Sequence, residues 1–185
     1  MLKKRDLQDC QALYSLIVHP DVFPYVRHKP GSFEEYLFIT KQMIEAEERG
    51  EVISRTILDE WGQPIGTISL YDIADKAGFL GTWLGKPYHG KGYNRSAKED
   101  FFNEIFFDYE IENVYLRIKK ENIRSIKAAE KLPYTVKIGG GEKQMRLGPE
   151  QEGNYELYVV RKDAYNLYHK KNGFPYGGQL PPLEA

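Results

Sequence analysis

Residues 85–94 are the part of the sequence best suited to hold an anion. They read Gly-Lys-Pro-Tyr-His-Gly-Lys-Gly-Tyr-Asn and lie between a predicted strand and a predicted helix. Glycines let backbone N–H groups turn inward, and a helix N-terminus carries partial positive charge, so the pattern favours a phosphate or pyrophosphate. Neither a P-loop nor a dinucleotide fingerprint is present. An exposed turn rich in glycine and lysine is the alternative.

A second polar segment, residues 119–125, lies where a predicted strand passes into a helix. Asn122 is a good N-cap residue, and Ser125 falls three positions later. An ordinary capped helix would look the same. Basic residues outnumber acidic ones between 86 and 131, which suits a polyphosphate ligand, whereas residues 1–60 are more acidic and suit a cationic or amine substrate. Ordinary solvated surfaces would explain both charge patterns equally well.

Hydrophobic periodicity predicts the elements that position these segments. Two helices occupy the first fifty residues, one capped by Asp6 and one beginning with a capping box at Ser32. Later helices are predicted at 94–107 and 123–132. Strands are predicted at 52–58, 65–71, 79–84, 114–118, 134–138 and 155–160. Gly81 suggests a bulge or a close backbone approach.

The predicted order is two helices, three antiparallel strands, helix, strand, helix and two strands, which is a mixed α/β sheet in one domain. We expect that domain to span residues 1–170, followed by a Pro- and Gly-rich tail at 171–185. Residues 139–154 are glycine-rich and polar, so we expect a long mobile connection there.

Composition excludes several classes of protein. The 185 residues carry a net charge of −1, so we expect neither a nucleic-acid partner nor membrane binding. One cysteine, Cys10, allows no internal disulfide and no zinc site built on several thiolates, and the four histidines have no metal-like spacing. We expect a cytoplasmic protein without a metal, either a monomer or a homodimer.

Residues 79–94 and 122–132, in this order of strands and helices, resemble the GNAT superfamily of N-acetyltransferases, in particular its ribosomal-protein-alanine-acetyltransferase-like branch. The first segment is similar to "strand, Pro-Tyr/Trp-x-Gly-Lys-Gly-Tyr, helix". The second is similar to "Asn-x-x-Ser … Glu-Lys-Leu-Gly-Phe", and an N-terminal Asp-Pro-Val type element appears here as Pro20-Asp21-Val22. The resemblance covers about residues 1–165.

The resemblance implies a GNAT-like fold, with a mostly antiparallel sheet splayed at its middle and about four helices. It implies acetyl-CoA as the donor, held between the strands at 79–84 and 114–118. Pantetheine would pair with the backbone of Trp83, Leu84 and Gly85, and Asn122 would bond the same arm. Pyrophosphate would meet N–H groups of Gly90, Lys91, Gly92, Tyr93, Asn94 and Arg95. Ser125, which would approach the thioester sulfur, and Lys131, from the nearby basic residues, complete the predicted cofactor-binding set.

The sequence departs from the family pattern at several positions. His89 replaces Gln or Arg, Asn94 replaces a small residue, and Pro133 replaces a glycine. Many relatives use a tyrosine to protonate the leaving thiolate, but Ala129 stands at that position. Branch members use the serine instead, which makes Ser125 the candidate acid.

The general base is left open by the sequence. Glu156 and Tyr158 are the catalytic candidates on the last strand, and Tyr71 and Asp72 are further ones. In each case an ordinary strand residue is the alternative.

The predicted function is transfer of an acetyl group from acetyl-CoA to a primary amine by direct attack in a ternary complex. A non-catalytic acyl-CoA-binding or regulatory module with the same fold is the alternative, and a structural protein with a vestigial fold is a third possibility. The acceptor stays open among protein N-termini, polyamines, amino sugars and amino acids. By the resemblance, residues 23–32 and 139–154 would shape its pocket, with Tyr25, Tyr71, Tyr155 and Tyr158 as candidate lining residues.

Overall fold

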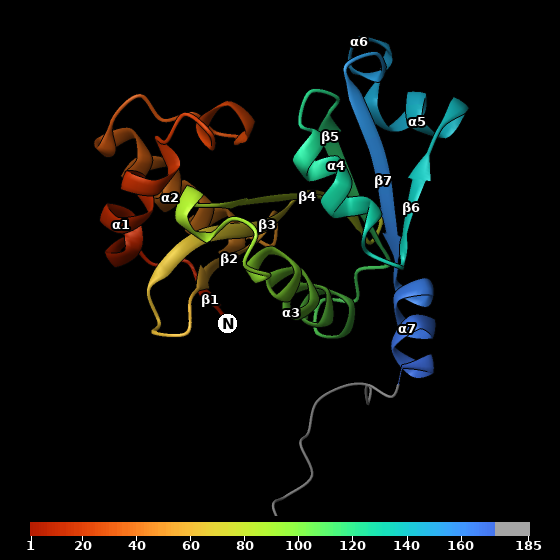
Figure 1. Ribbon diagram of the computed structural model, residues 1–185, viewed down its shortest axis with the longest axis horizontal. Helices are drawn as coiled ribbons and strands as arrows, with labels where there is room; N and C mark the ends of the chain where they lie inside the picture. The colour runs from red at the N-terminus through yellow and green to blue at the C-terminus, as the bar shows by residue number, and fades with distance from the viewer. Residues whose placement is uncertain (173–185) are drawn as a thin grey trace, which may run out of the picture.

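A seven-stranded sheet in the order β1-β2-β3-β4-β5-β7-β6 forms the centre of the molecule (Figure 1). The computed structural model describes residues 1–172, so the predicted tail falls outside it except for its first two residues. The strands are β1 (Leu2–Lys4), β2 (Ile53–Leu58), β3 (Pro64–Ala74), β4 (Ala77–Leu84), β5 (Asn113–Lys119), β6 (Thr135–Ile138) and β7 (Tyr155–Arg161).

The sheet is divided at its middle. Strands β1 to β4 are antiparallel to their neighbours, and so are β5, β7 and β6. The two halves meet only where residues 77–79 of β4 pair in parallel with residues 113–115 of β5. Beyond Phe79 and Tyr115 the two strands separate, which leaves an open gap in the sheet.

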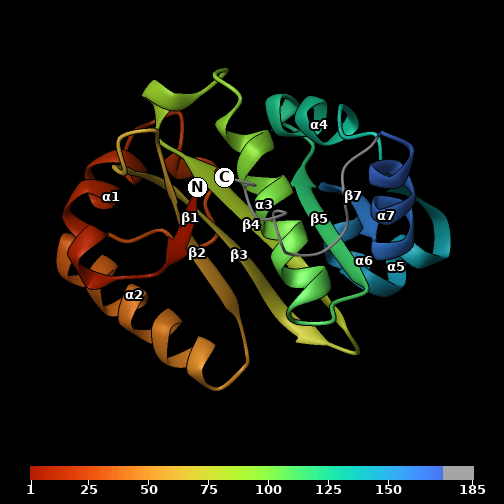
Figure 2. The same ribbon diagram turned by 90° about the horizontal axis from the view of Figure 1, so that it is seen from below.

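Helices cover both faces of the sheet. They are α1 (Cys10–Ile17), α2 (Phe33–Glu48), α3 (Tyr93–Phe107), α4 (Ile123–Glu130), α5 (Gly140–Leu147), α6 (Pro149–Glu152) and α7 (Lys162–Lys171). Figures 1 and 2 show α1 and α2 beside the N-terminal half of the sheet and α4 to α7 beside the C-terminal half. The largest apolar cluster joins α3, α4 and α7 to one face, whereas α5 packs on the opposite face.

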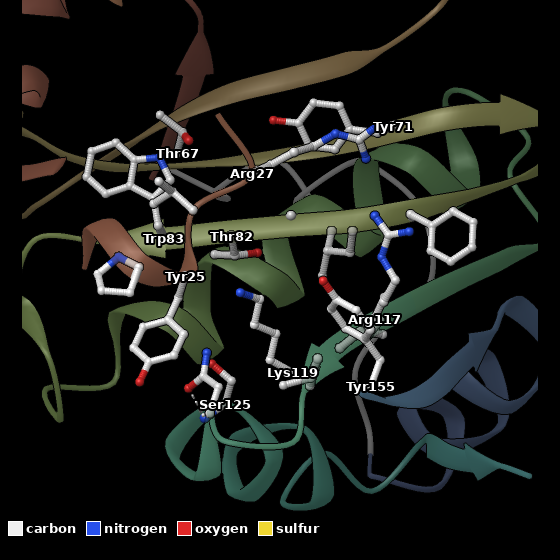
Figure 3. A pocket seen from close by; sticks show the side chains of 18 of the residues that line it. Tyr25, Arg27, Thr67, Tyr71, Thr82, Trp83, Arg117, Lys119, Ser125 and Tyr155 are labelled. Carbon is white, nitrogen blue, oxygen red and sulfur yellow. Dashed lines mark hydrogen bonds between the residues drawn. The ribbon is translucent and has the colours of Figure 1, made fainter. Parts of the chain in front are cut away.

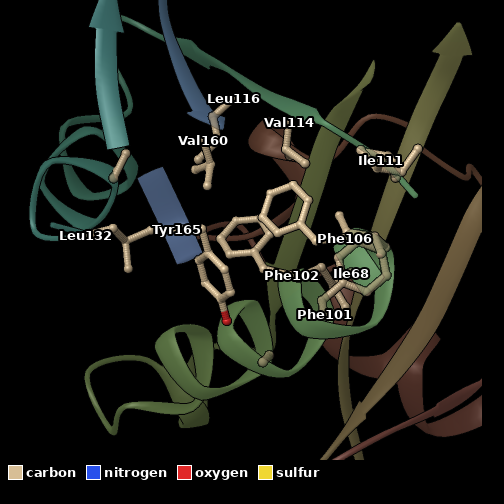
Figure 4. Close-up of a cluster of buried hydrophobic side chains, with 14 of the residues drawn as sticks. Ile68, Phe101, Phe102, Phe106, Ile111, Val114, Leu116, Leu132, Val160 and Tyr165 are labelled. Atoms are coloured by element: carbon tan, nitrogen blue, oxygen red, sulfur yellow. The ribbon is translucent and has the colours of Figure 1, made fainter. Parts of the chain in front are cut away.

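Helix α3 is anchored by aromatic side chains. Phe101, Phe102 and Phe106 are fully buried, and Phe102 and Phe106 contact Tyr165 of α7 (Figure 4). Burying an aromatic side chain of this size stabilises the fold by about 2 kcal/mol. The helix is therefore held firmly at its C-terminal end, so that its N-terminal turn is positioned beside the gap.

Every helix and strand predicted from periodicity is present, with small changes at the ends. The first predicted helix begins as a 3-10 turn at Leu7–Asp9, capped by Asp6, before α1 starts at Cys10. Ser32 caps α2 by accepting a bond from the N–H of Glu35 (3.2 Å), as the capping box predicts. Gly81 pairs regularly with Ser69, so it marks a close approach and not a bulge. A Cβ there would lie 2.8 Å from the ring of Tyr71.

The structure corrects the prediction for residues 139–154 and adds two elements. That segment contains α5 and α6 instead of an irregular mobile connection. Strand β1 was not predicted because it has only three residues, and α7 because its sequence is mostly polar. No helix among residues 1–172 is long and apolar enough to cross a membrane.

Candidate functional site

Two pockets open into the gap between β4 and β5. The first, which we call the strand pocket, has a volume of about 360 Å³ and lies among β3, β4, β5 and the segment at residues 24–29. The second, which we call the loop pocket, has a volume of about 480 Å³ and lies between the glycine-rich loop and α4. Four residues line both pockets, namely Thr82, Trp83, Lys98 and Ser125. The pockets therefore meet at this point.

The edge of β4 that faces the gap exposes unpaired backbone groups. The N–H of Gly85 donates to Ile65 O on β3 (2.8 Å), and hydrogen-bonded residues alternate along an antiparallel strand. Trp83 and Gly85 therefore direct their backbone groups toward β3, while Thr82 and the N–H of Leu84 face the gap. Leu80 is directed toward β5, where Phe79 pairs with Tyr115. This corrects the predicted set, in which Trp83, Leu84 and Gly85 all offered backbone partners.

The glycine-rich loop presents several N–H groups to the loop pocket. Gly90 and Gly92 have φ values of 75° and 88°, a conformation that favours glycine, and α3 begins directly afterwards. In the described part of the chain, the loop residues 90–92 donate no backbone hydrogen bond. The N–H of Arg95 donates to Gly92 O (3.0 Å), so the run of open donors ends at Asn94. The Asn94 Oδ1 atom is buried without a hydrogen-bond partner among residues 1–172.

His89 connects the glycine-rich loop to α4. Its Nδ1 atom lies 2.5 Å from Arg124 Nη1, and its Nε2 atom lies 2.8 Å from Leu84 O. Because a guanidinium only donates hydrogen bonds, Nδ1 must accept, and Nε2 carries the proton that is donated to Leu84 O. Burial, together with the nearby charge of Arg124, lowers the pKa of His89 and favours this neutral form. The contact links Arg124, which lines the loop pocket, to the glycine-rich loop.

Helix α4 brings Ser125 to the meeting point of the pockets. Asn122 caps this helix by accepting a hydrogen bond from the N–H of Ser125 (3.2 Å). Both residues line the strand pocket, and Lys131 lines the loop pocket. Ala129 is fully buried in the main apolar cluster, so that position offers the gap no polar group.

Lys98 of α3 reaches the same point, and the sequence did not predict it as a site residue. Only 7% of Lys98 is exposed, and within residues 1–172 it has no hydrogen bond and no ion pair. Burial alone lowers its pKa to about 8. The sequence does contain an indication that Lys98 is buried, because it stands three and four positions before Phe101 and Phe102 and so shares their face of the helix.

Arginines and aromatic rings form the outer wall of the strand pocket (Figure 3). Arg27 makes a bidentate ion pair with Asp72, with N–O distances of 2.9 to 3.1 Å, and lies over the ring of Tyr71. Arg117 lies 5.4 Å from the ring centre of Phe79 and 5.6 Å from that of Tyr155. Of the tyrosines that were expected here, Tyr25, Tyr71 and Tyr155 line the strand pocket.

Glu156 and Tyr158 lie outside both pockets, contrary to their prediction as catalytic candidates. Glu156 pairs with Lys137 (3.2 Å) and Lys143 (3.9 Å). Tyr158 is 1% exposed, and its hydroxyl donates to Glu130 (3.0 Å). Burial and this carboxylate raise the pKa of Tyr158, so it is unsuited to accept a proton. Residues 139–148 and 151–154 do not line the strand pocket either, although Gln151 accepts a bond from Arg117 (2.7 Å).

Several solved acetyltransferase structures have the same fold. A chimera of spermidine N-acetyltransferase from Vibrio cholerae is 15% identical, with a TM-score of 0.71 and coverage of 90% of this chain and 97% of that one. A ribosomal-protein-S5-alanine acetyltransferase from Vibrio fischeri is 20% identical (TM-score 0.71, coverage 88% and 92%). A nucleotide-linked sugar GNAT is 17% identical (TM-score 0.73, coverage 95% and 94%).

The sequence itself identifies the family. No curated protein matches the chain. The family model described as "Acetyltransferase (GNAT) domain", however, matches residues 1–135, well over half of the sequence. This chain therefore belongs to the GNAT family of acetyltransferases.

Proposed function

We propose that this acetyltransferase moves an acetyl group from acetyl-CoA directly to a primary amine, with both substrates bound at once. The observation that carries this proposal is the meeting of two pockets in one gap of the sheet. The loop pocket suits the donor and the strand pocket suits the acceptor, and they share Thr82, Lys98 and Ser125. The two substrates can then meet without a covalent enzyme intermediate.

The loop pocket matches the chemistry of acetyl-CoA. Open N–H groups at residues 90–94 suit a pyrophosphate, and Arg124, Lys127 and Lys131 supply positive charge beside them. The open edge of β4 suits the amides of a pantetheine arm, and the unpartnered Asn94 Oδ1 can accept from one of them. Bound acetyl-CoA supplies an acetyl thioester that a neutral amine can attack.

The residues at the meeting point have separate tasks in this reaction. The open N–H group of Thr82 can stabilise the oxyanion that forms when the thioester carbonyl is attacked. The Ser125 hydroxyl can hydrogen-bond or protonate the departing thiolate. The attacking amine has a pKa near 10.4 in water, so it must lose a proton before attack.

A thiol-release assay with acetyl-CoA and a panel of amines, run beside calorimetric titration with CoA, tests the proposal. We expect both CoA binding and amine-dependent thiol release. Binding without release on any amine would contradict acetyl transfer and favour the non-catalytic acyl-CoA module. Absence of binding would contradict both and favour a structural protein.

The donor site has a matched pair of glycine variants. Gly92 and Gly62 have φ values of 88° and 77°, so Gly92→Ala and Gly62→Ala impose similar backbone strain. Only Gly92 belongs to the glycine-rich loop. We expect Gly92→Ala to weaken CoA binding about tenfold or more and Gly62→Ala to leave it unchanged. Equal effects of the two substitutions would contradict the assignment of this loop to the donor.

A further inference from the structure

We propose that the amine acceptor is a small molecule carrying a carboxylate or a phosphate, which Lys29, Lys98 and Lys119 bind in the strand pocket. This inference rests on the proposed function, because it concerns the acceptor half of the same site. The strand pocket would thus select amines that also carry a negatively charged group.

All the charged side chains that line the strand pocket are positive. Its charged lining residues are Arg27, Lys29, Lys98, Arg117 and Lys119, and no Asp or Glu lines it in the part of the chain that the structure describes. Surfaces of small soluble proteins usually mix both signs. A concave site with a single sign of charge concentrates ligands of the opposite sign.

Two of the five cations are already engaged by the protein. Arg27 is neutralised by its bidentate pair with Asp72. Arg117 donates to Gln151 and lies between two aromatic rings. Lys29, Lys98 and Lys119 have no ion pair and no hydrogen bond within residues 1–172, so they are the ones available to a ligand. Figure 3 shows Lys119 extending from the end of β5 toward the middle of the strand pocket.

Of the three lysines, Lys98 gives the strongest argument for a bound anion. A buried cation without a partner is unfavourable, because the protein replaces none of the hydration that the ammonium loses. Lys98 is 7% exposed and lines the strand pocket, so an anion bound there would compensate its charge. An acceptor with a negative group would thus be bound partly by relief of this cost.

The phosphates of the donor do not explain these lysines. The basic residues that line the loop pocket and not the strand pocket are His89, Arg95, Arg124, Lys127 and Lys131. Lys29 and Lys119 line the strand pocket alone. Lys98 lies at the junction, beyond the loop that suits the pyrophosphate. The positive charge of the strand pocket is therefore left for the second substrate.

A polyamine acceptor is disfavoured by the same charges. The acidic character of residues 1–60 suggested a cationic substrate, but none of those carboxylates lines the strand pocket. Glu47, for example, pairs with the buried Arg55 at 2.5 Å. The carboxylates of residues 1–60 therefore offer a cationic acceptor in the strand pocket no ion pair.

Matched pairs of amines that differ only in the anionic group test the inference. Glucosamine 6-phosphate is compared with glucosamine for a phosphate, and alanine with alaninamide for a carboxylate; spermidine is the cationic probe. We expect kcat/KM to be at least tenfold higher for the anionic member of one pair. The pair that responds tells which of the two anionic groups is recognised.

Variants show whether the lysines are responsible. Lys119→Met and Lys29→Met should each reduce the preference for the anionic member at least threefold, mainly through KM. Lys41→Met, an exposed position on α2 outside both pockets, is the matched control and should leave the preference unchanged. An unaltered preference in both pocket variants would overturn the assignment of these residues.

The failure of the inference differs from the failure of the proposed function. Thiol release that is as fast with glucosamine, alaninamide or spermidine as with the anionic amines would overturn the inference and leave acetyl transfer supported. No thiol release with any amine would contradict acetyl transfer. In that case, calorimetric titration of the CoA-bound protein with glucosamine 6-phosphate and glucosamine decides the inference: equal affinities overturn it, and tighter binding of the phosphate supports the anion site.

Discussion

Lys98 and Ser125 approach the gap between β4 and β5 from two different helices, and their environments differ. Ser125 lies in the first turn of α4, where its N–H donates to the capping residue Asn122, and such caps are common at helix starts. Lys98 occupies a buried helix position where an apolar residue would be more stable. A residue that costs stability at such a position is a candidate for function, whereas one that stabilises it needs no such explanation.

The cost of Lys98 should be measurable as a gain in stability when it is removed. Burial lowers its pKa from 10.5 to about 8, so at pH 7 the folded protein carries the full cost of the buried charge. Lys98→Met should therefore raise the free energy of unfolding at pH 7, by up to about 3 kcal/mol. Chemical denaturation followed by circular dichroism measures the change.

The gain should also depend on pH. Between about pH 8 and 10.5 the unfolded wild-type chain binds more protons at this lysine than the folded one, so wild-type stability rises relative to the variant. The advantage of Lys98→Met should shrink across that range. Lys41→Met, at an exposed position, should change stability little at any pH. A variant less stable than wild type at pH 7 would show that Lys98 makes compensating interactions.

Ser125 should affect turnover more than binding. Its hydroxyl is placed to assist a leaving thiolate, and that thiolate is weakly basic, so loss of the hydroxyl slows the reaction without abolishing it. Ser125→Ala should lower kcat about a hundredfold, near the low end for a lost general acid, with CoA affinity within about twofold of wild type. Steady-state kinetics and calorimetry report the two quantities. An unchanged kcat would exclude Ser125 as the acid.

The sequence predicted those features of the candidate site that depend on local structure. A glycine loop before a helix and an Asn-x-x-Ser cap are determined by neighbours in the sequence, so the loop at Gly90 and Gly92 and the cap at Asn122 and Ser125 have the predicted local structure. Glu156 was misassigned because its ion pair with Lys137 is formed across two strands. Such a contact depends on the register of the sheet, which a single sequence does not reveal.

At the level of elements, the pairing of β3 with β4 fixes the exposed edge of β4. Gly66 makes this pairing close, because a Cβ there would lie 2.2 Å from Trp83 O and 2.9 Å from Leu84 Cα. These contacts are with backbone atoms, which cannot turn aside. Any side chain at position 66 must push β4 away from β3 and disturb the strand edge that borders the gap.

Gly66→Ala should therefore destabilise the protein and weaken CoA binding together. We expect a loss of about 2 to 3 kcal/mol in unfolding free energy, in the range of overpacked core substitutions, with CoA affinity reduced at least threefold. Gly153→Ala is the matched control, because nothing lies within 4 Å of a Cβ there and its φ is −66°. Denaturation and CoA titration measure both effects. An unchanged affinity would show that the donor does not depend on this edge.

The elements differ in how well the sequence predicts them. Helix α3 and strands β2 to β5 have long apolar patterns and were predicted at nearly the correct residues. Helix α7 was missed because its packing depends largely on one residue, Tyr165, which contacts Phe102 and Phe106 of a distant helix. Helix α5 follows two glycines and has few apolar residues. Tertiary contacts determine both helices, and periodicity does not detect them.

At the level of the whole molecule, opposite charges are segregated although the net charge is only −1. The two pockets contain basic side chains, and in the described part of the chain neither is lined by a carboxylate. Acidic residues balance this charge elsewhere on the protein. A nearly neutral protein can therefore present a strongly positive gap, and composition alone hides it.

This segregation predicts how activity depends on salt. A positive pocket attracts anionic substrates over distances of about a Debye length, which is about 10 Å at 0.1 M ionic strength and about 3 Å at 1 M. For the preferred anionic acceptor, KM should rise several-fold between 0.05 and 0.5 M NaCl, since the lysines are increasingly screened. For glucosamine or alaninamide, whose ammonium group is repelled by the pocket, KM should stay constant or fall. Measuring both acceptors at saturating acetyl-CoA removes the effect of salt on donor binding. A parallel rise for both acceptors would mean that salt acts on the protein generally, and would contradict a cationic acceptor pocket.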